Sequence, residues 1–185
     1  MIGQDFERNI VHSFNNYANT YDKKLIAYRH VQMRYQPQLF DVLVDSRANE
    51  FYLAIECKSI DPSTINHLYF KRQFSWKDGH CQLEREDKWL RLSGRNGILA
   101  VELRPPRPAR TRLYLVPWSV VMAPFNAGYT CVDQELICAC PSCDRQGGKY
   151  IFDDDLLGQV IERLGSYPKS TRKAYRPKPR PKKEK

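Results

Sequence analysis

Three ionisable residues, Asp41, Glu56 and Lys58, stand at the ends of two apolar runs in the stretch FDVLVDSRANEFYLAIECKS, residues 40–59. Both runs are rich in Val, Leu, Ile and aromatic residues, and a polar turn separates them, which is typical of a β-hairpin. If residues 47–50 form the turn, Asp41 falls opposite Glu56 in the paired strands. Like charges placed directly opposite each other repel, so these two carboxylates need a cation between them.

Side-chain alternation brings Lys58 to the same place. Glu56 and Lys58 share one face of their strand, and Cys57 points to the other. Carboxylate oxygens, completed by water and substrate phosphate, hold Mg²⁺ for phosphate chemistry, and the backbone carbonyl of Cys57 offers a further ligand. A metal so held activates water near neutral pH, and Lys58 would orient that water or offset transition-state charge. The competing interpretation is a surface hairpin with ordinary salt bridges at its strand ends.

The elements that position these residues follow from the apolar pattern. Phe6, Ile10 and Phe14 recur at helical spacing, with Glu7 on the flank of the stripe. A strand–helix–strand order along the chain favours a parallel crossover. The sequence therefore predicts an α/β fold, with an N-terminal helix and a central mixed sheet with flanking helices. Helices are expected over 4–17, over 82–94 with Gly94 as the stop, and within 150–165, and strands over 40–45, 51–57, 97–103 and 112–118.

The charged hairpin resembles the PD-(D/E)XK nuclease motif, in which a strand-start Asp is followed, across a hairpin, by (D/E)-x-K. More narrowly, DFERNIV, FYLAIECKS and GILAVEL…RLYLVPW are similar to the archaeal Holliday junction resolvases. The resemblance implies a restriction-endonuclease-like fold and a homodimer that cuts branched DNA with Mg²⁺ or Mn²⁺. It also implies a role for each site residue: Asp41, Glu56 and the Cys57 carbonyl hold the metal, Lys58 serves the water, Glu7 completes the site, and Gln82 helps hold the water.

Two other functions stay open at this point. One is a restriction- or repair-type nuclease of the same superfamily. The other is a non-catalytic, zinc-braced nucleic-acid-binding protein with the same fold.

Basic residues are concentrated at the C-terminus, where residues 166–185 hold nine Lys or Arg and one Glu of a chain with net charge +9. This proline-rich segment is predicted to be disordered and to bind phosphate backbones, or simply to solubilise the chain. Residues 60–81 interleave aromatic and basic side chains, as opened or branched nucleic acids favour. A hydrophobic cluster under a long loop would have the same composition. The candidate DNA contacts are Lys71, Arg72, Lys77, Arg172, Lys173 and Arg176.

Four cysteines, Cys131, Cys138, Cys140 and Cys143, fall within a short segment. The spacing of the last two suits a zinc knuckle, so a structural four-sulfur Zn²⁺ site and a compact insert with unliganded thiols are both open. No apolar run is long enough to span a membrane and no signal-peptide pattern opens the chain, so a cytoplasmic protein is expected. The expected organisation is a nuclease core (1–125), a Cys-rich insert (126–149), a helix on the core or on a dimer partner (150–165) and the basic tail (166–185).

Overall fold

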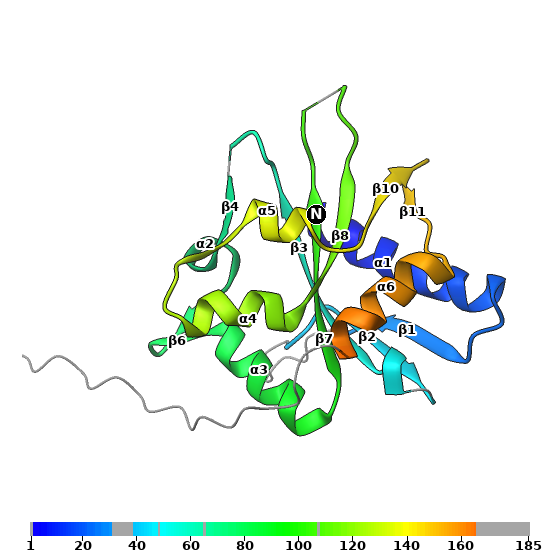
Figure 1. The fold of residues 1–185 in the computed structure, drawn as a ribbon, viewed down its shortest axis with the longest axis horizontal. Helices are drawn as coiled ribbons and strands as arrows, with labels where there is room; N and C mark the ends of the chain where they lie inside the picture. Colours follow the sequence, from blue (N-terminus) through cyan, green and yellow to red (C-terminus); the bar gives the residue numbers. More distant parts are fainter. Residues whose placement is uncertain (1, 31–38, 48, 65, 107, 166–185) are drawn as a thin grey trace, which may run out of the picture.

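The computed structural model describes residues 2–30, 39–47, 49–64, 66–106 and 108–165, and in this part of the chain a mixed sheet has helices on both faces (Figure 1). The seven strands lie in the order β1-β2-β3-β7-β8-β10-β11. Their bounds are β1 (Leu25–Arg29), β2 (Val42–Ser46), β3 (Leu53–Ile60), β7 (Asn96–Leu103), β8 (Arg112–Pro117), β10 (Ser142–Gln146) and β11 (Lys149–Tyr150). The predicted α/β architecture is confirmed.

Four short strands lie outside this sheet. β4 (His67–Tyr69) pairs with β9 (Cys131–Asp133), and β5 (Trp76–Lys77) pairs with β6 (His80–Cys81). The helices are α1 (Ile2–Thr20), α2 (Phe70–Gln73), α3 (Gln82–Ser93), α4 (Trp118–Asn126), α5 (Gln134–Cys138) and α6 (Asp154–Gly165). Among the described helices, none is both long enough and apolar enough to cross a bilayer.

The two faces of the sheet bury separate apolar clusters. α1 contributes Phe6, Ile10 and Phe14 to one cluster, and α6 adds three buried aliphatic side chains to it. α3 and α4 cover the opposite face, where Leu90 and Trp118 are buried. α6 therefore docks on the core, one of the two positions expected for it. Alternating residues of β2, β3, β7 and β8 enter the two clusters in turn, as the pleat of a strand requires.

The central pairing matches the expected crossover. β3 and β7 are parallel neighbours, paired from Leu53 with Asn96 to Ile60 with Leu103, and α3 lies between them in the chain. α3 begins with a capping box in which the Cys81 backbone N–H donates to Glu84 at 3.0 Å. It ends at Gly94, whose positive φ of 73° is a conformation that glycine adopts at little cost.

The β2–β3 hairpin has the expected register but not the expected turn. Val42 pairs with Ile55 and Val44 pairs with Leu53, so Asp41 is in register with Glu56. The expected tight turn over residues 47–50 is wrong, because the ladder ends at Val44 and a short 3₁₀ helix (Asn49–Phe51) follows. Phe51 is buried against Tyr17, with ring centroids 6.0 Å apart, and so packs in the core instead of extending the ladder.

The chain after α4 pairs with two earlier strands of the fold. β9 pairs with β4, and β10 pairs with the edge of β8 through Ser142 opposite Tyr114. Residues 131–150 are thus joined to the rest of the fold by backbone hydrogen bonds. The basic tail, with Arg172, Lys173 and Arg176, lies outside the described residues.

Candidate active site

The structure brings Asp41, directly before β2, together with Glu56 and Lys58 of β3. The Asp41 backbone N–H donates to the Ile55 carbonyl at 3.1 Å, which holds the start of β2 against β3. The Asp41 carboxylate accepts a hydrogen bond of 2.7 Å from the Cys57 backbone N–H. Lys58 Nζ lies 2.6 Å from Glu56 Oε1. The two acids and the amine thus lie around one point, as the hairpin pattern predicted.

The Asp41 carboxyl shows the cost of placing two acids together. Desolvation and the negative charge of Glu56 raise the pKa of Asp41 to about 7, against the lowering effects of the Cys57 N–H and Lys58. Burial and a like charge both disfavour the ionised form. Without a further cation, the site resists carrying two full negative charges.

Lys58 supplies the positive charge in this cluster. Burial alone would lower the pKa of the Lys58 ammonium, but Glu56, Asp41 and Glu86 together raise it above its ordinary value. The ammonium also lies 5.0 Å from the centre of the Phe74 ring. Lys58 is therefore charged at neutral pH and is held on the same side of the sheet as both acids.

Gln82 lies at the first turn of α3 and reaches the acids from there. Its Nε2 atom donates to Glu56 Oε1 at 2.9 Å and to Glu86 Oε1 at 2.6 Å. Its Oε1 atom accepts from the Ser75 backbone N–H at 3.1 Å, which fixes the orientation of the amide. Gln82 thus lies beside the motif acid Glu56, and its expected part in holding a water stays a prediction.

Glu86 is a member of this cluster that the sequence analysis missed. It is fully buried, and desolvation and the nearby Glu56 raise its pKa well above the ordinary value. Its Oε2 atom has no hydrogen-bond partner among the described residues. A signal was available, because Glu86 follows Gln82 by one turn of a predicted helix and shares its face.

Glu7 approaches from the other face of the sheet, on α1. Its Oε2 atom is held by Arg29 of β1, at 2.8 Å from Nε and 2.6 Å from Nη2. Its charge adds a small upward contribution to the pKa of Asp41. Glu7 is thus near the acid pair but engaged by Arg29, a partner that the sequence did not indicate.

The oxygen donors at this point suit a hard divalent cation. Asp41 and Glu56 offer carboxylates, and Cys57, between Glu56 and Lys58, offers a backbone carbonyl. Burial and the charge of Glu56 raise the pKa of Asp41, and a bound divalent ion would oppose this by favouring the ionised carboxylate. Magnesium sites in proteins use one or two carboxylates and leave other positions to water and phosphate. The residues present therefore fit such an ion.

The four cysteines do not form a common site in the described structure. Cys140 is buried in the cluster beneath α3 and α4, whereas Cys143 packs against the cluster beneath α1 and α6. Cys138 is exposed, and Cys131 lies on β9. Because β10 enters the sheet, its alternation sends Cys143 to the face opposite that of Cys140. The four-sulfur zinc site considered from the sequence is not assembled.

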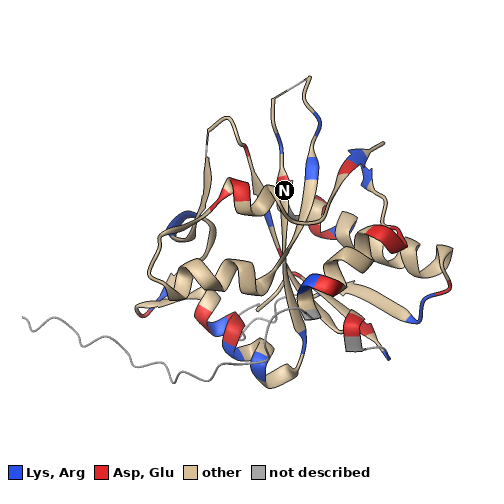
Figure 2. Ribbon diagram, viewed as in Figure 1, with Lys and Arg blue, Asp and Glu red and all other residues tan. Residues whose placement is uncertain are grey.

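The basic residues of the 60–81 segment are exposed, and the aromatic residues divide into two groups. Lys71 and Arg72 lie on α2, coloured blue in Figure 2, and Arg72 stacks 5.6 Å from the Tyr69 ring. Lys77 is exposed on β5 beside Trp76, which is 47% exposed. In contrast, the intervening Phe70 and Phe74 are buried in the main core. The buried rings match the hydrophobic-cluster interpretation of the segment, and nucleic-acid binding by the exposed rings and cations stays a prediction.

Comparison with known proteins gives a structural likeness but no relative in sequence. A scan against protein-family models finds no family that matches, and a search of curated proteins finds no significant match. Thirteen solved chains match the fold. One is the 1.6 Å structure of Archaeoglobus fulgidus Hjc, a Holliday junction resolvase from an archaeal hyperthermophile. It is 18% identical to this chain with a TM-score of 0.44, and the match covers 75% of this chain and 93% of that one.

Proposed function

We propose that the protein is a metal-dependent DNA endonuclease that hydrolyses phosphodiester bonds of branched DNA as a Holliday junction resolvase. The observation that carries the proposal is the meeting of Asp41 and Glu56 beside the charged Lys58, in the order and register of the nuclease motif. A surface hairpin with ordinary salt bridges would not bury these groups. Glu56 is 3% exposed.

The residues divide the work. Asp41, Glu56 and the Cys57 carbonyl would hold Mg²⁺ or Mn²⁺, and the ion would supply polarisation of the phosphate and activation of water near neutral pH. Lys58 offsets the negative charge that develops on the reacting phosphate, and it orients the attacking water. Gln82 fixes the Glu56 carboxylate through its 2.9 Å hydrogen bond and would help hold the water through that carboxylate. Glu7, once released by Arg29, completes the site from α1.

Basic side chains would hold the nucleic acid. Lys71, Arg72 and Lys77 contact phosphates near the cutting point, and the tail residues Arg172, Lys173 and Arg176 add affinity for any polyanion. A homodimer would place two such sites about a two-fold axis, which suits symmetric cutting of two strands. Residues 1–125 form the nuclease core in this proposal, and 126–165 brace it.

The test is cleavage of a four-way junction, a matched linear duplex and a flap by the full chain, with Mg²⁺ or with a chelator. We expect metal-dependent nicking, strongest on the junction, and a loss of about 10²–10³-fold in Asp41→Asn and Glu56→Gln, the size seen when transition-state charge stabilisation is removed. Asp155→Asn, an exposed acid of α6, is the matched control.

Each alternative predicts a different result. Equal cutting of junction and duplex would contradict the resolvase function and would support a restriction- or repair-type nuclease. Junction binding with no cutting under any divalent ion would leave a non-catalytic binding protein. If both acid variants cut at the wild-type rate, Asp41 and Glu56 would not form the active site.

A further inference from the structure

A second cluster of metal-ligating atoms, made of residues other than the acid pair, lies on the small β4–β9 ribbon. The ring nitrogens of His67, the Cys131 thiol and the Asp133 carboxylate offer ligand atoms that all lie within 4.8 Å of one another. Among the residues that the structure describes, this is the one group of three or more such side chains that meets this distance. The residues come from segments far apart in the chain.

The pairing of the ribbon explains why these side chains meet. His67 is directly opposite Asp133 and Tyr69 is opposite Cys131, so all four point to the same side of the ribbon. The residues between them, Leu68 and Val132, are fully buried and anchor the other side in the core beneath α4. The pairing of the two strands therefore fixes the relative positions of the ligand residues.

The arrangement of His67 and Asp133 departs from that of a simple hydrogen-bonded pair. His67 Nδ1 lies 3.0 Å from Asp133 Oδ1, yet this buried nitrogen makes no hydrogen bond of acceptable geometry. Two atoms that lie close but do not point at each other are expected when both face a third partner. Ligand atoms around a tetrahedral zinc ion lie about 3–4 Å apart, given metal–ligand distances of about 2.0–2.3 Å.

We propose that His67, Cys131 and Asp133 form a binding site for a zinc ion, with the fourth position open to solvent. A thiolate and an imidazole select zinc over magnesium, which takes oxygen ligands. The side chain of Asp133 is 63% exposed, so an ion has a path to the site from solvent. Cys131 was one of the four cysteines considered for zinc from the sequence, but its partners are a histidine and an aspartate instead.

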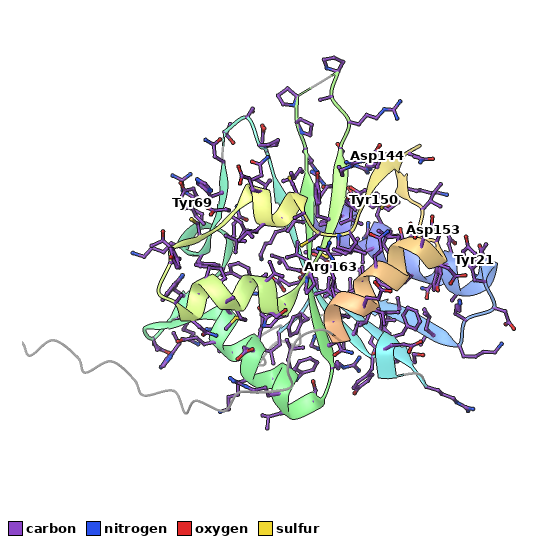
Figure 3. All side chains as sticks on the ribbon, in the orientation of Figure 1. Tyr21, Tyr69, Asp144, Tyr150, Asp153 and Arg163 are labelled. Carbon is purple, nitrogen blue, oxygen red and sulfur yellow. The ribbon has the colours of Figure 1, made fainter. Side chains whose placement is uncertain are left out.

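The ion would lock the ribbon next to a basic pocket. A cavity of about 600 Å³ is lined by His67, Tyr69, Lys71, Arg72 and Thr130, among others, so one ligand of the ion forms part of its wall. α2, with its two basic residues, follows β4 without a break. Figure 3 marks Tyr69 at the end of the molecule away from Tyr150 and Asp153, so this corner is far from the α1–α6 face. Zinc would hold this corner rigid by joining residues 67–69 to residues 131–133.

The proposal does not depend on nuclease activity, and metal binding tests it directly. The metal-free full chain is titrated with Co²⁺, in excess Mg²⁺ to occupy the acid pair, and thiolate-to-cobalt absorption is followed before Zn²⁺ displaces the cobalt. We expect one tightly bound ion per chain, with the absorption of a cysteine ligand. Because loss of an outer hydrogen-bonding partner already weakens metal sites by roughly 10–100-fold, loss of a direct ligand should cost about 100-fold or more.

Three variants and two controls decide the outcome. Cys131→Ser should abolish the thiolate absorption, and His67→Gln and Asp133→Asn should weaken binding while the circular dichroism stays that of the wild type. Cys138→Ser and Cys143→Ser should bind as the wild type does. Should Cys131→Ser fail to fold, the two other ligand variants carry the test. Absence of thiolate absorption in the wild type would overturn the proposal. So would a result in which His67→Gln and Asp133→Asn retain zinc while the cysteine controls lose it.

Discussion

Lys58 Nζ lies 2.6 Å from Glu56 Oε1, two residues away on the same face of β3. The amine therefore compensates one of two facing acids in the metal-free protein. A divalent ion at the acid pair would take over that charge balance and leave the ammonium free for the substrate. This relationship makes Lys58 an element of the site whose removal should separate binding from cutting.

Lys58→Met should cut junction DNA about 10²–10³-fold more slowly than the wild type, because the phosphate would lose the cation beside it in the transition state. Junction affinity should stay within a few-fold, since one phosphate contact among several is lost. Single-turnover cleavage and equilibrium binding measure the two effects. Lys149→Met, an exposed lysine on β11, is the matched control. A parallel loss of binding and cutting in Lys58→Met would assign the lysine to DNA affinity alone.

The stability of the metal-free protein should fall as the pH rises from about 4 to about 7. The pKa of Asp41 is about 7 in the folded protein against an ordinary 3.8, so in this window the folded chain holds a proton that the unfolded chain has released. Stability decreases with pH wherever the folded state binds more protons. Denaturant unfolding in the presence of a chelator, at several pH values, measures the slope of the unfolding free energy against pH.

Asp41→Asn is the reference for this slope, because it removes the titrating group while keeping the shape of the side chain. We expect a flatter pH dependence in the variant across the same window. Identical slopes in the two proteins would show that Asp41 titrates normally.

Gly97→Ala should destabilise the protein by about 1–3 kcal/mol, the usual cost of overpacking a core. A Cβ at this position of β7 would lie 2.8 Å from Trp118 Cβ and would also overlap the end of Leu90, so α3 and α4 both press on the strand here. Thermal or denaturant unfolding measures the loss.

Gly158 of α6 provides the comparison, since a Cβ there would meet open space. Gly158→Ala should stabilise the protein by up to about 1 kcal/mol, because alanine favours a helix over glycine. Equal changes in unfolding free energy for the two substitutions would mean that the side chains around Gly97 move aside for a methyl group at no cost.

Removal of residues 166–185 should weaken binding to junction, duplex and flap by the same factor, since a cationic arm binds phosphates without reading shape. The dependence of affinity on salt should also become shallower, because fewer counterions are released. Binding titrations over a range of salt concentrations test both points. A loss confined to junctions would instead assign branch recognition to the tail.

The sequence predicted the parts of the fold in which local pattern and burial agree. The helical stripe of Phe6, Ile10 and Phe14, the hairpin register and the Gly94 stop depend on periodicity and backbone conformation, which neighbouring residues determine. β1 was missed, because its alternation is weak and Ile26 is 59% exposed. β9 and β10 were missed because their partners, β4 and β8, are distant in the sequence.

The same division applies to the site. Asp41, Glu56 and Lys58 are joined by one hairpin, so spacing alone could bring them together. The contacts of Glu86 with Gln82 and of Arg29 with Glu7 depend on how α3 and α1 dock on the sheet, and no local rule supplies that. Cysteine spacing was misleading for a related reason, since strand pairing placed Cys131 beside His67 and separated Cys140 from Cys143.

The parallel β3–β7 pair also bears on the order in which the molecule folds. A hairpin between neighbouring segments closes early, whereas a parallel pair must wait for the intervening helix to cross over. The two acids of the hairpin should therefore meet before α3 brings Gln82 and Glu86 to them. The docking of α3 then buries Glu86 beside Asp41 and Glu56, which repel each other. Divalent ions in a refolding buffer should accelerate this step.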